Sequence, residues 1–199
     1  DMMHYFERLT KSVPVVYTLH DPIPAPGTLA YTLFSKFSGH NFISISLAQQ
    51  KNPNLSLHFV GNVYHGIDEA KFHFQEASGD YLLFMGRLVP EKGLHSAISV
   101  SLSTGIRLSI GAEFPAREGE SDYFKEKIRP HLPNPLLRKA GMVDGAGRMA
   151  LYAGAKALLF PIEWEEPFGM VMIEAMATGT PVVAFNRGSV SEIVVDGVT

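Results

Sequence analysis

The chain has 199 residues, of which 46% are hydrophobic and 19% charged, which is typical of a folded domain and too apolar for a disordered chain. Its 17 basic and 20 acidic side chains give a net charge of -3 without a long run of one sign, which argues against nucleic acid as a partner. Because cysteine is absent, disulfides, thiolate zinc sites and thiol catalysis are excluded.

Neither a membrane span nor a secretion signal is visible in the sequence. No stretch approaches the roughly 18 consecutive apolar residues of a membrane helix, and residues 1–12 lack the apolar core of a signal peptide. We therefore expect a cytoplasmic protein. The chain opens on Asp1 instead of a methionine and closes just after a turn begins, at VVDGVT. We expect it to be a fragment of a longer protein.

Apolar, β-rich runs alternate with helical patterns along the chain. This alternation predicts parallel sheets wound with helices, that is, an α/β fold. Strands are expected at 13–19, 41–45, 81–85, 106–110, 140–143, 157–160 and 181–184, and helices at 94–104, 122–129, 148–153 and 171–177.

The pattern also divides the chain in two. Hydrophobic periodicity lapses in the polar stretch 68–80, so we place a linker at residues 71–80. Residues 81–199 have the size and strand content of a nearly complete doubly wound domain. Residues 1–70 contain too few strands for such a domain and are expected to be the remainder of one.

A loop with two cations follows the first strand of the second unit. Arg87 is separated from the strand 81–85 by Gly86, and Lys92 precedes Gly93, where a helix is expected to begin. Ligands of open α/β sheets bind at the carboxyl edge, and a helix start offers free amides and partial positive charge. The loop suits an anionic diphosphate. Taken alone, however, two loop cations are more often solvated surface charges.

Two glutamates flank the start of a later helix. Pro167 and Gly169 interrupt the loop, so Glu166 precedes the helix and Glu174 lies one turn inside it, on the face of Met170. We expect both carboxylates to line one groove at different depths. A carboxylate accepts hydrogen bonds from vicinal hydroxyls of a ribose or hexose, and free amides near the helix start bind oxygens. That the acidic residues only favour the helix dipole is an equal alternative.

Together these segments resemble a known family. GRLVPEKG, EPFGMVMIEAMATGTPVVA and GSVSEIVVDG are similar to the motifs of family 4 of the retaining glycosyltransferases, densely so from residue 81 to 199. VVYTLHD, FISIS and VYHGID are more loosely similar to the end of the family's acceptor-side domain. The resemblance implies the GT-B fold of two Rossmann-like domains, the first truncated here. His65 stands where the family usually has asparagine, so the role of that position is left open.

The resemblance implies contacts with a nucleotide-sugar donor. Arg87 and Lys92 would hold its diphosphate, and Glu174 would take the ribose hydroxyls. The main chain at Met142 and Val143, after a strand, would face the nucleotide base. The donor is thus expected to lie along the carboxyl edge of the second unit.

The same resemblance places residues around the transferred sugar. Glu166, with the backbone of Phe168 and Gly169 and the helix start at Met170, would grip that sugar. His20, at the end of its strand, would lie across the cleft near it. Glu166, Arg87, Lys92 and His20 are therefore the predicted catalytic residues.

We predict a retaining glycosyltransferase that moves a hexosyl unit from a UDP- or GDP-sugar to an acceptor hydroxyl. Departure of the leaving group puts negative charge on the diphosphate, which two cations and a helix start stabilise. No Asp-x-Asp pair occurs, which agrees with transfer without a metal; no cofactor is expected beside the NDP-sugar substrate. Glu166 is either a nucleophile or a positioning group. We favour positioning, because the family's leaving diphosphate itself acts as the base.

Several alternatives stay open at this point. A sugar-nucleotide epimerase or phosphorylase of the same fold, or a non-catalytic nucleotide-sugar-binding module, fits the same motifs. The acceptor can be a saccharide, a lipid or a small molecule. A peripheral membrane contact of the longer protein is left open. Whether this chain transfers sugar without the rest of that protein is also left open. GAGRMA at 145–150 matches a dinucleotide-binding pattern, but the strand before it is short and Asp144 intervenes, so NAD binding is not expected.

Overall fold

The computed structural model describes residues 13–51, 54–76 and 79–199. The first twelve residues, on which the prediction of no signal peptide rests, lie outside this part of the chain. In the described ranges, none of the helices has the length and apolarity that a membrane crossing needs.

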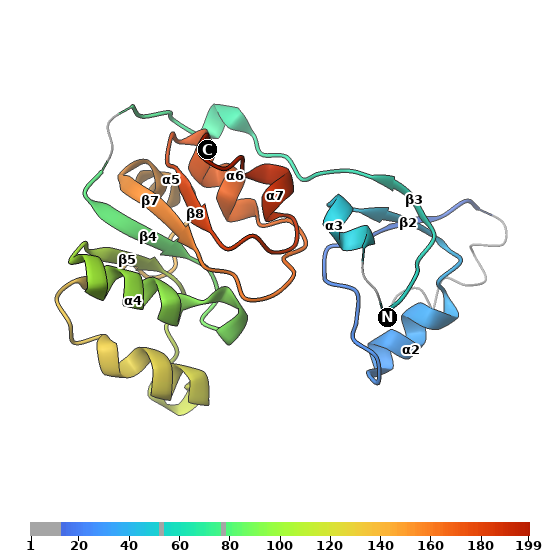
Figure 1. Cartoon of the computed structure of the whole chain (residues 1–199), viewed down its shortest axis with the longest axis horizontal. Helices are drawn as coiled ribbons and strands as arrows, with labels where there is room; N and C mark the ends of the chain where they lie inside the picture. Colours follow the sequence, from blue (N-terminus) through green and yellow to red (C-terminus); the bar gives the residue numbers. More distant parts are fainter. Residues whose placement is uncertain (1–12, 52–53, 77–78) are drawn as a thin grey trace. The chain divides into compact units, whose positions relative to one another are not determined.

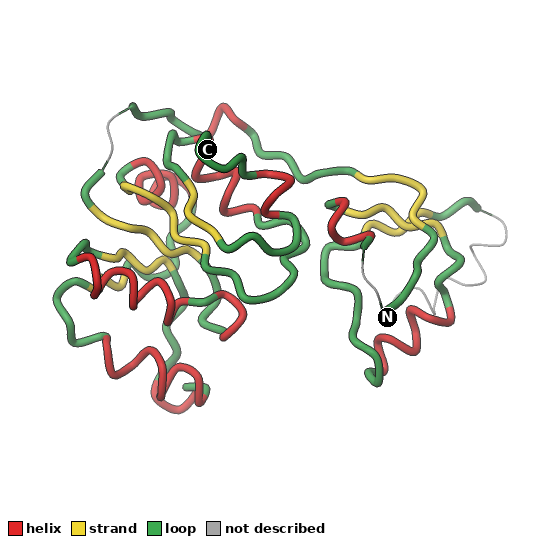
Figure 2. Tube along the Cα trace, in the orientation of Figure 1, coloured by secondary structure: helices red, strands yellow, loops and turns green. Residues whose placement is uncertain are grey.

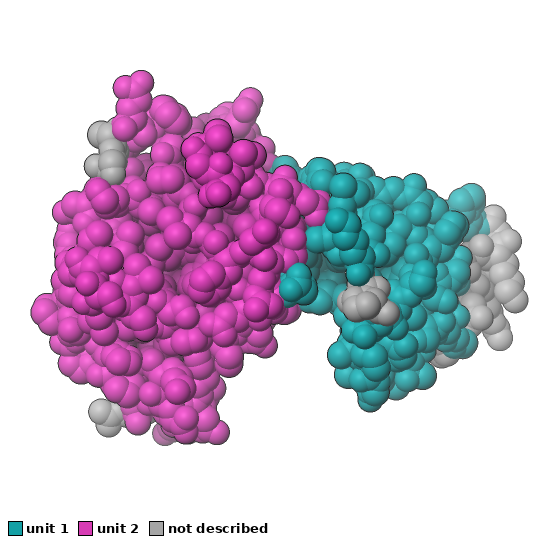
Figure 3. Space-filling view, in the orientation of Figure 1, with its two compact units in different colours: residues 1–66, 165–168 teal, residues 67–164, 169–199 magenta. Residues whose placement is uncertain are grey.

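The chain forms two compact units, coloured separately in Figure 3. Unit 1 consists of Asp1–Gly66 and Glu165–Phe168, and unit 2 consists of Ile67–Trp164 and Gly169–Thr199. The short segment Glu165–Phe168, which belongs to the predicted sugar-binding loop, is therefore grouped with unit 1. The assignment of unit 1 to the end of an acceptor-side domain stays a prediction.

Unit 1 is built on three parallel strands in the order β1-β2-β3. β1 (Val16–Thr18) and β2 (Asn41–Ser44) lie within predicted strands, whereas β3 (Phe59–Asn62) was not predicted. β3 was missed because half of its four residues, Gly61 and Asn62, are types that are depleted in strands.

Two helices accompany this small sheet. α2 (Leu29–Lys36) begins where the Thr28 hydroxyl accepts a hydrogen bond from the amide of Tyr31, and α3 (Leu47–Gln50) is a single turn. The buried core of unit 1 centres on Phe42, which packs among Ile23, Phe37 and Leu57.

Unit 2 contains a five-stranded parallel sheet in the order β6-β5-β4-β7-β8 (Figure 1). The strands are β4 (Tyr81–Met85), β5 (Leu108–Gly111), β6 (Leu137–Lys139), β7 (Ala155–Phe160) and β8 (Val182–Ala184). The chain runs outward from β4 to β6 and then returns to place β7 on the other side of β4. The topological switch point, where ligands of such sheets bind, therefore lies between β4 and β7.

Helical segments connect these strands, as the tube in Figure 2 shows. Single 3-10 turns occur at Glu69–Lys71, Pro90–Lys92, Arg117–Gly119 and Arg129–His131, and a five-residue π-helix spans Phe124–Ile128 within the predicted helix 122–129. The α-helices are α4 (Leu94–Thr104), α5 (Gly145–Ala153), α6 (Met170–Ala177) and the short α7 (Val190–Ile193).

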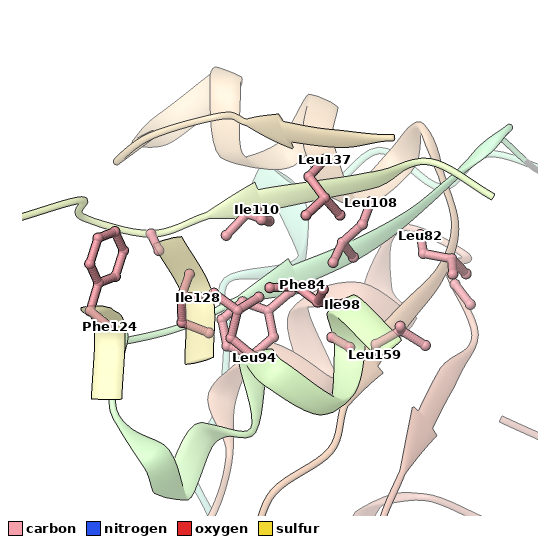
Figure 4. Packing of buried hydrophobic residues seen from close by; sticks show 13 residues of the cluster. Leu82, Phe84, Leu94, Ile98, Leu108, Ile110, Phe124, Ile128, Leu137 and Leu159 are labelled. Atoms are coloured by element: carbon pink, nitrogen blue, oxygen red, sulfur yellow. The ribbon is translucent and has the colours of Figure 1, made fainter. Parts of the chain in front are cut away.

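Helices cover both faces of the sheet, so its central strands β4, β5 and β7 are largely buried, whereas the edge strand β6 exposes Arg138 and Lys139. Leu82 and Phe84 point to the face covered by α4, where Leu94 and Ile98 pack against them (Figure 4). Leu83, between them in the sequence, points to the opposite face, which α5 and α6 cover. This alternation holds unit 2 together as a helix-sheet-helix sandwich.

The predicted strand 140–143 is wrong. The strand in this region is β6, which pairs with β5 through Leu137 to Lys139 and ends there. Gly141 has a φ of 75°, a left-handed conformation that turns the chain away from the sheet. Met142 and Val143 consequently lie in the loop after the strand.

Gly93 fixes the loop after β4 against the end of β7. Its φ is 70°, and a Cβ atom at this position would lie 1.9 Å from the carbonyl oxygen of Pro161. Only glycine allows this conformation together with such close contact. The glycine of GRLVPEKG therefore serves the packing between two loops at the switch point.

We expect Gly93→Ala to destabilise unit 2 more than Gly105→Ala does. Both glycines have left-handed φ angles, 70° and 71°, so alanine costs about 1–2 kcal/mol at either position. Only at Gly93 would the methyl group overlap the Pro161 carbonyl, which adds about 1–3 kcal/mol. Urea unfolding followed by fluorescence of Trp164, the chain's single tryptophan, measures the difference. Equal losses would contradict this packing.

Candidate functional site

A pocket of about 650 Å³ opens at the carboxyl edge of the sheet in unit 2. Residues that follow β4, β5 and β6 form its wall, among them Arg87, Glu113 and Met142, together with Arg148 of α5 and Val171 in the first turn of α6. Its charged wall residues are two arginines and one glutamate. In the described residues, no cluster of three or more His, Asp or Glu side chains is arranged to hold a metal ion.

The two predicted phosphate-binding cations occupy different places. Arg87 is exposed in the loop after β4 and belongs to the pocket wall. Lys92, the last residue of a 3-10 turn, is not among the wall residues in the described part of the chain. Its Nζ lies 4.9 Å from the centre of the Trp164 ring, a cation-π distance. The structure therefore brings Arg87 to the pocket and holds Lys92 against the loop after β7.

That loop is tied to the residues after β4 by polar contacts. The amide of Glu163 donates to the carbonyl of Glu91 at 2.8 Å, and the Glu163 carboxylate lies 3.0 Å from Nε2 of His95 in α4. The Tyr123 hydroxyl lies 3.1 Å from Nδ1 of His95, and burial raises the pKa of Tyr123, which keeps that hydroxyl protonated. The two motif-bearing loops at the switch point thus form one connected structure.

Glu174 is buried and bonded to two side chains of α5. The Tyr152 hydroxyl donates a hydrogen bond of 2.7 Å to Oε2 of Glu174, and Nη2 of Arg148 is bonded to the same oxygen. Burial, followed by the Glu174 charge, raises the pKa of Tyr152, so its hydroxyl remains a donor. Glu174 is not among the pocket-wall residues, whereas Arg148 is.

Sequence reasoning missed Arg148 and Tyr152. They stand four residues apart on α5 and so share one helix face, which is the only signal in the sequence. That Glu174 faces them becomes visible only when α5 and α6 are seen to cover the same side of the sheet.

The remaining predicted donor residues lie around the start of α6 and after β6. Met142 and Val143 both belong to the pocket wall. Gly169, with a φ of 83°, precedes Met170, where α6 begins one residue before the predicted range 171–177.

Glu166 and Phe168 are both buried, with 8% and 4% of their surface exposed, and are grouped with unit 1. The edge of the Phe168 ring packs against His65, with ring centres 5.1 Å apart. Because Glu174 belongs to unit 2, a groove shared by the two glutamates stays a prediction.

His20, the predicted catalytic histidine, forms a pair with His65 in unit 1. Nδ1 of His20 lies 3.4 Å from Nε2 of His65, and the rings are stacked with centres 5.1 Å apart. Burial, and then the proximity of His20, lowers the pKa of His65. The chain therefore places a second titratable ring next to the predicted catalytic one.

The strand order and the pocket at the carboxyl edge of the sheet define unit 2 as an open, doubly wound α/β unit. The model of the family described as "Glycosyl transferases group 1" matches residues 66–199. The chain belongs to this family. Its structural neighbours are GT-B glycosyltransferases, which confirms the predicted fold class.

The chain is similar to two curated proteins over more than half of its length. Glycogen synthase of Mycobacterium tuberculosis is 34% identical over 146 residues, which cover 69% of this chain and 34% of that protein. Lipopolysaccharide 1,2-N-acetylglucosaminetransferase of Salmonella typhimurium is 30% identical over 127 residues, covering 59% and 33%. The chain thus spans about a third of the length of these relatives.

Solved structures resemble nearly the whole chain. AviGT4, a glycosyltransferase involved in avilamycin A biosynthesis, matches with a TM-score of 0.65 and 26% identity, over 96% of this chain and 61% of its own. Anabaena Alr3699/HepE in complex with UDP-glucose matches with a TM-score of 0.74 and 25% identity, over 99% and 60%. The likeness therefore includes residues that precede position 66, where the family match begins.

An NMR titration is expected to place the pKa of His65 below its ordinary value of 6.5. Since the fold favours the neutral ring, the unfolded chain takes up this proton first as the pH falls through 6.5, and unit 1 loses stability toward acid pH. His20→Gln removes the smaller of the two causes, so the pKa of His65 should rise but stay below 6.5. A value of 6.5 or more in the unsubstituted protein would contradict this environment.

Proposed function

We propose that the protein is a retaining glycosyltransferase that moves a hexosyl unit from a UDP- or GDP-sugar to an acceptor hydroxyl, without a metal or a further cofactor. The observation that carries the proposal is the pocket at the switch point of unit 2. Its wall contains Arg87 together with Met142 and Val143, whose main chain we assign to the base. A cation for phosphates and free peptide groups for a base are what a nucleoside diphosphate needs.

Membership of the family and the similar proteins support the donor class. One of the similar structures holds UDP-glucose, and a curated relative is named as an N-acetylglucosaminetransferase. Both names concern sugars of the hexose class. A nucleotide-activated hexose is therefore the donor we propose for this chain.

The charges at the carboxyl edge support the chemistry of the leaving group. Breaking the bond to the anomeric carbon leaves negative charge on the diphosphate, and preplaced cations stabilise this charge most effectively when water is excluded. Arg87 would bind the diphosphate at the pocket wall. Lys92 would approach it from the Trp164 ring, and the free amides at the start of α6 would add partial positive charge.

Retention and the role of Glu166 belong to the same proposal. The acceptor hydroxyl would attack from the face that the diphosphate leaves, with the diphosphate as base and Glu166 holding the sugar. Burial of Glu166 and Phe168 supports a fixed position for this loop. The acceptor class, a cytoplasmic location and a peripheral membrane contact of the longer protein remain predictions from the sequence.

Product analysis tests the proposal directly. The protein is incubated with UDP-glucose or GDP-mannose, and early products are read by proton NMR. We expect release of the nucleoside diphosphate and a sugar product with the anomeric configuration of the donor, at a rate that EDTA leaves unchanged. An epimerised sugar nucleotide as the only product, or a sugar phosphate formed with inorganic phosphate, would identify the alternative enzyme classes instead.

Arg87→Ala and Lys92→Ala are each expected to weaken UDP binding. Each removes a charge-assisted contact with the diphosphate, worth about 1.5–3 kcal/mol. Isothermal titration calorimetry measures the dissociation constants. Arg107→Ala is the control, because this arginine pairs with Asp80 on the surface of the same unit. Unchanged titrations of both variants would remove the phosphate assignment.

The two glutamates are expected to differ in their kinetic effects. Glu174→Ala should weaken nucleotide binding, because it acts on the nucleotide end of the donor. Glu166→Ala should mainly lower the turnover number, because it acts on the transferred sugar. Steady-state kinetics with UDP-glucose and calorimetry with UDP separate the two effects. Identical behaviour of both variants would show that this division of roles is wrong.

A further inference from the structure

We propose that Arg148 is a further donor-binding residue and that Tyr152 and Glu174 position its guanidinium at the pocket wall. This inference rests on the proposed function, because it requires that the pocket of unit 2 takes a nucleoside diphosphate. It adds a cation that lies outside the segments that resemble the glycosyltransferase family.

The solvent exposure of the three side chains, which increases from Tyr152 through Glu174 to Arg148, supports this assignment. Tyr152 is fully buried, Glu174 is 9% exposed, and the Arg148 side chain keeps 33% of its surface exposed. Only Arg148 belongs to the pocket wall. Tyr152 and Arg148 both bind Oε2 of Glu174, so the carboxylate lies behind the guanidinium as seen from the pocket.

The charges explain why such a pair suits an anion site. A lone buried carboxylate beside the pocket would repel a diphosphate at a range where the protein interior screens poorly. Pairing with Arg148 neutralises Glu174 and leaves Arg87 to attract the ligand. The arginine thereby makes the glutamate compatible with a nucleoside diphosphate.

The guanidinium also has donors left for a ligand. Arginine carries five N–H groups, and the bond to Glu174 uses Nη2. Nε is buried and has no hydrogen-bond partner among the described residues. A buried donor without a partner is costly, so a small turn of the side chain toward a ribose or phosphate oxygen would gain a bond. Arg148 is therefore suited to bind the nucleotide directly.

Tyr152 acts through Glu174 and not on the ligand. Its ring is held in the apolar core between α5 and the sheet, and its carbonyl accepts a bond of 2.6 Å from the Thr180 hydroxyl. The hydroxyl is thus a fixed donor to Oε2. Removing it leaves the core filled but frees the carboxylate to rotate, and with it the guanidinium.

The first test compares two arginines of unit 2 that are each paired with a carboxylate. Arg148→Met is expected to weaken UDP binding by about tenfold or more, as for a lost charge-assisted contact. Arg107→Met, which breaks the surface pair with Asp80 and changes the net charge equally, should leave the affinity unchanged. Arg148→Lys should restore part of the loss. Unchanged or tighter binding by Arg148→Met would overturn the proposal, since the guanidinium would then be idle or would cover the site.

The second test separates positioning from plain structural support. Tyr152→Phe should weaken UDP binding, whereas Tyr81→Phe, which removes a bond of 2.7 Å to the Leu151 carbonyl of α5, should not. In the Arg148→Met background, Tyr152→Phe should have no further effect on affinity, because it acts through the arginine. An undiminished loss in that background would refute the positioning role. Trp164 fluorescence verifies that each variant is folded.

The outcomes distinguish this inference from the proposed function. If the unsubstituted protein binds neither UDP nor GDP, the proposed function fails and the inference with it. If UDP binds and Arg87→Ala weakens it while Arg148→Met does not, the proposed function stands and only the inference fails.

Discussion

The parallel pairing of β4 with β5 on one side and β7 on the other determines where everything else in unit 2 lies. Because all strands run the same way, their carboxyl ends and following loops meet at one edge. The return of the chain to β7 places the loop that follows this strand beside Glu91, Lys92 and Gly93. The loop after β4 packs directly on the Pro161 carbonyl at Gly93, so two loops that are far apart in the sequence are held together at this edge.

The elements that sequence reasoning predicted best are those with a strong internal pattern. α4 was predicted residue for residue, because its apolar positions recur at helical spacing and Gly105 ends it. The strand 140–143 failed because an apolar run was read without weighing Gly141, whose left-handed conformation ends pairing at β6. β3 was missed for the opposite reason, because its composition gives little indication of a strand.

The residues of the candidate site also divide into those that could be predicted from the sequence and those that could not. Arg87 follows a predicted strand, so its place at the carboxyl edge could be argued from the sequence. Met142 and Val143 were assigned only through the family resemblance, because the strand predicted there was wrong. The partners of Glu174 could not, because their contact depends on how α5 packs against α6, a fact of tertiary structure. Arg148 therefore changes the prediction most. Glu174, which was predicted to bind the ribose, is bonded to Arg148, and of these two residues only Arg148 belongs to the pocket wall.

The central claim is that the pocket at the β4–β7 switch point binds the nucleotide part of the donor. Crystal structure determination of the protein with UDP tests it most directly. The account predicts a diphosphate next to Arg87 and a base facing the main chain at Met142 and Val143. A nucleotide bound elsewhere on the protein, with this pocket empty, would contradict it.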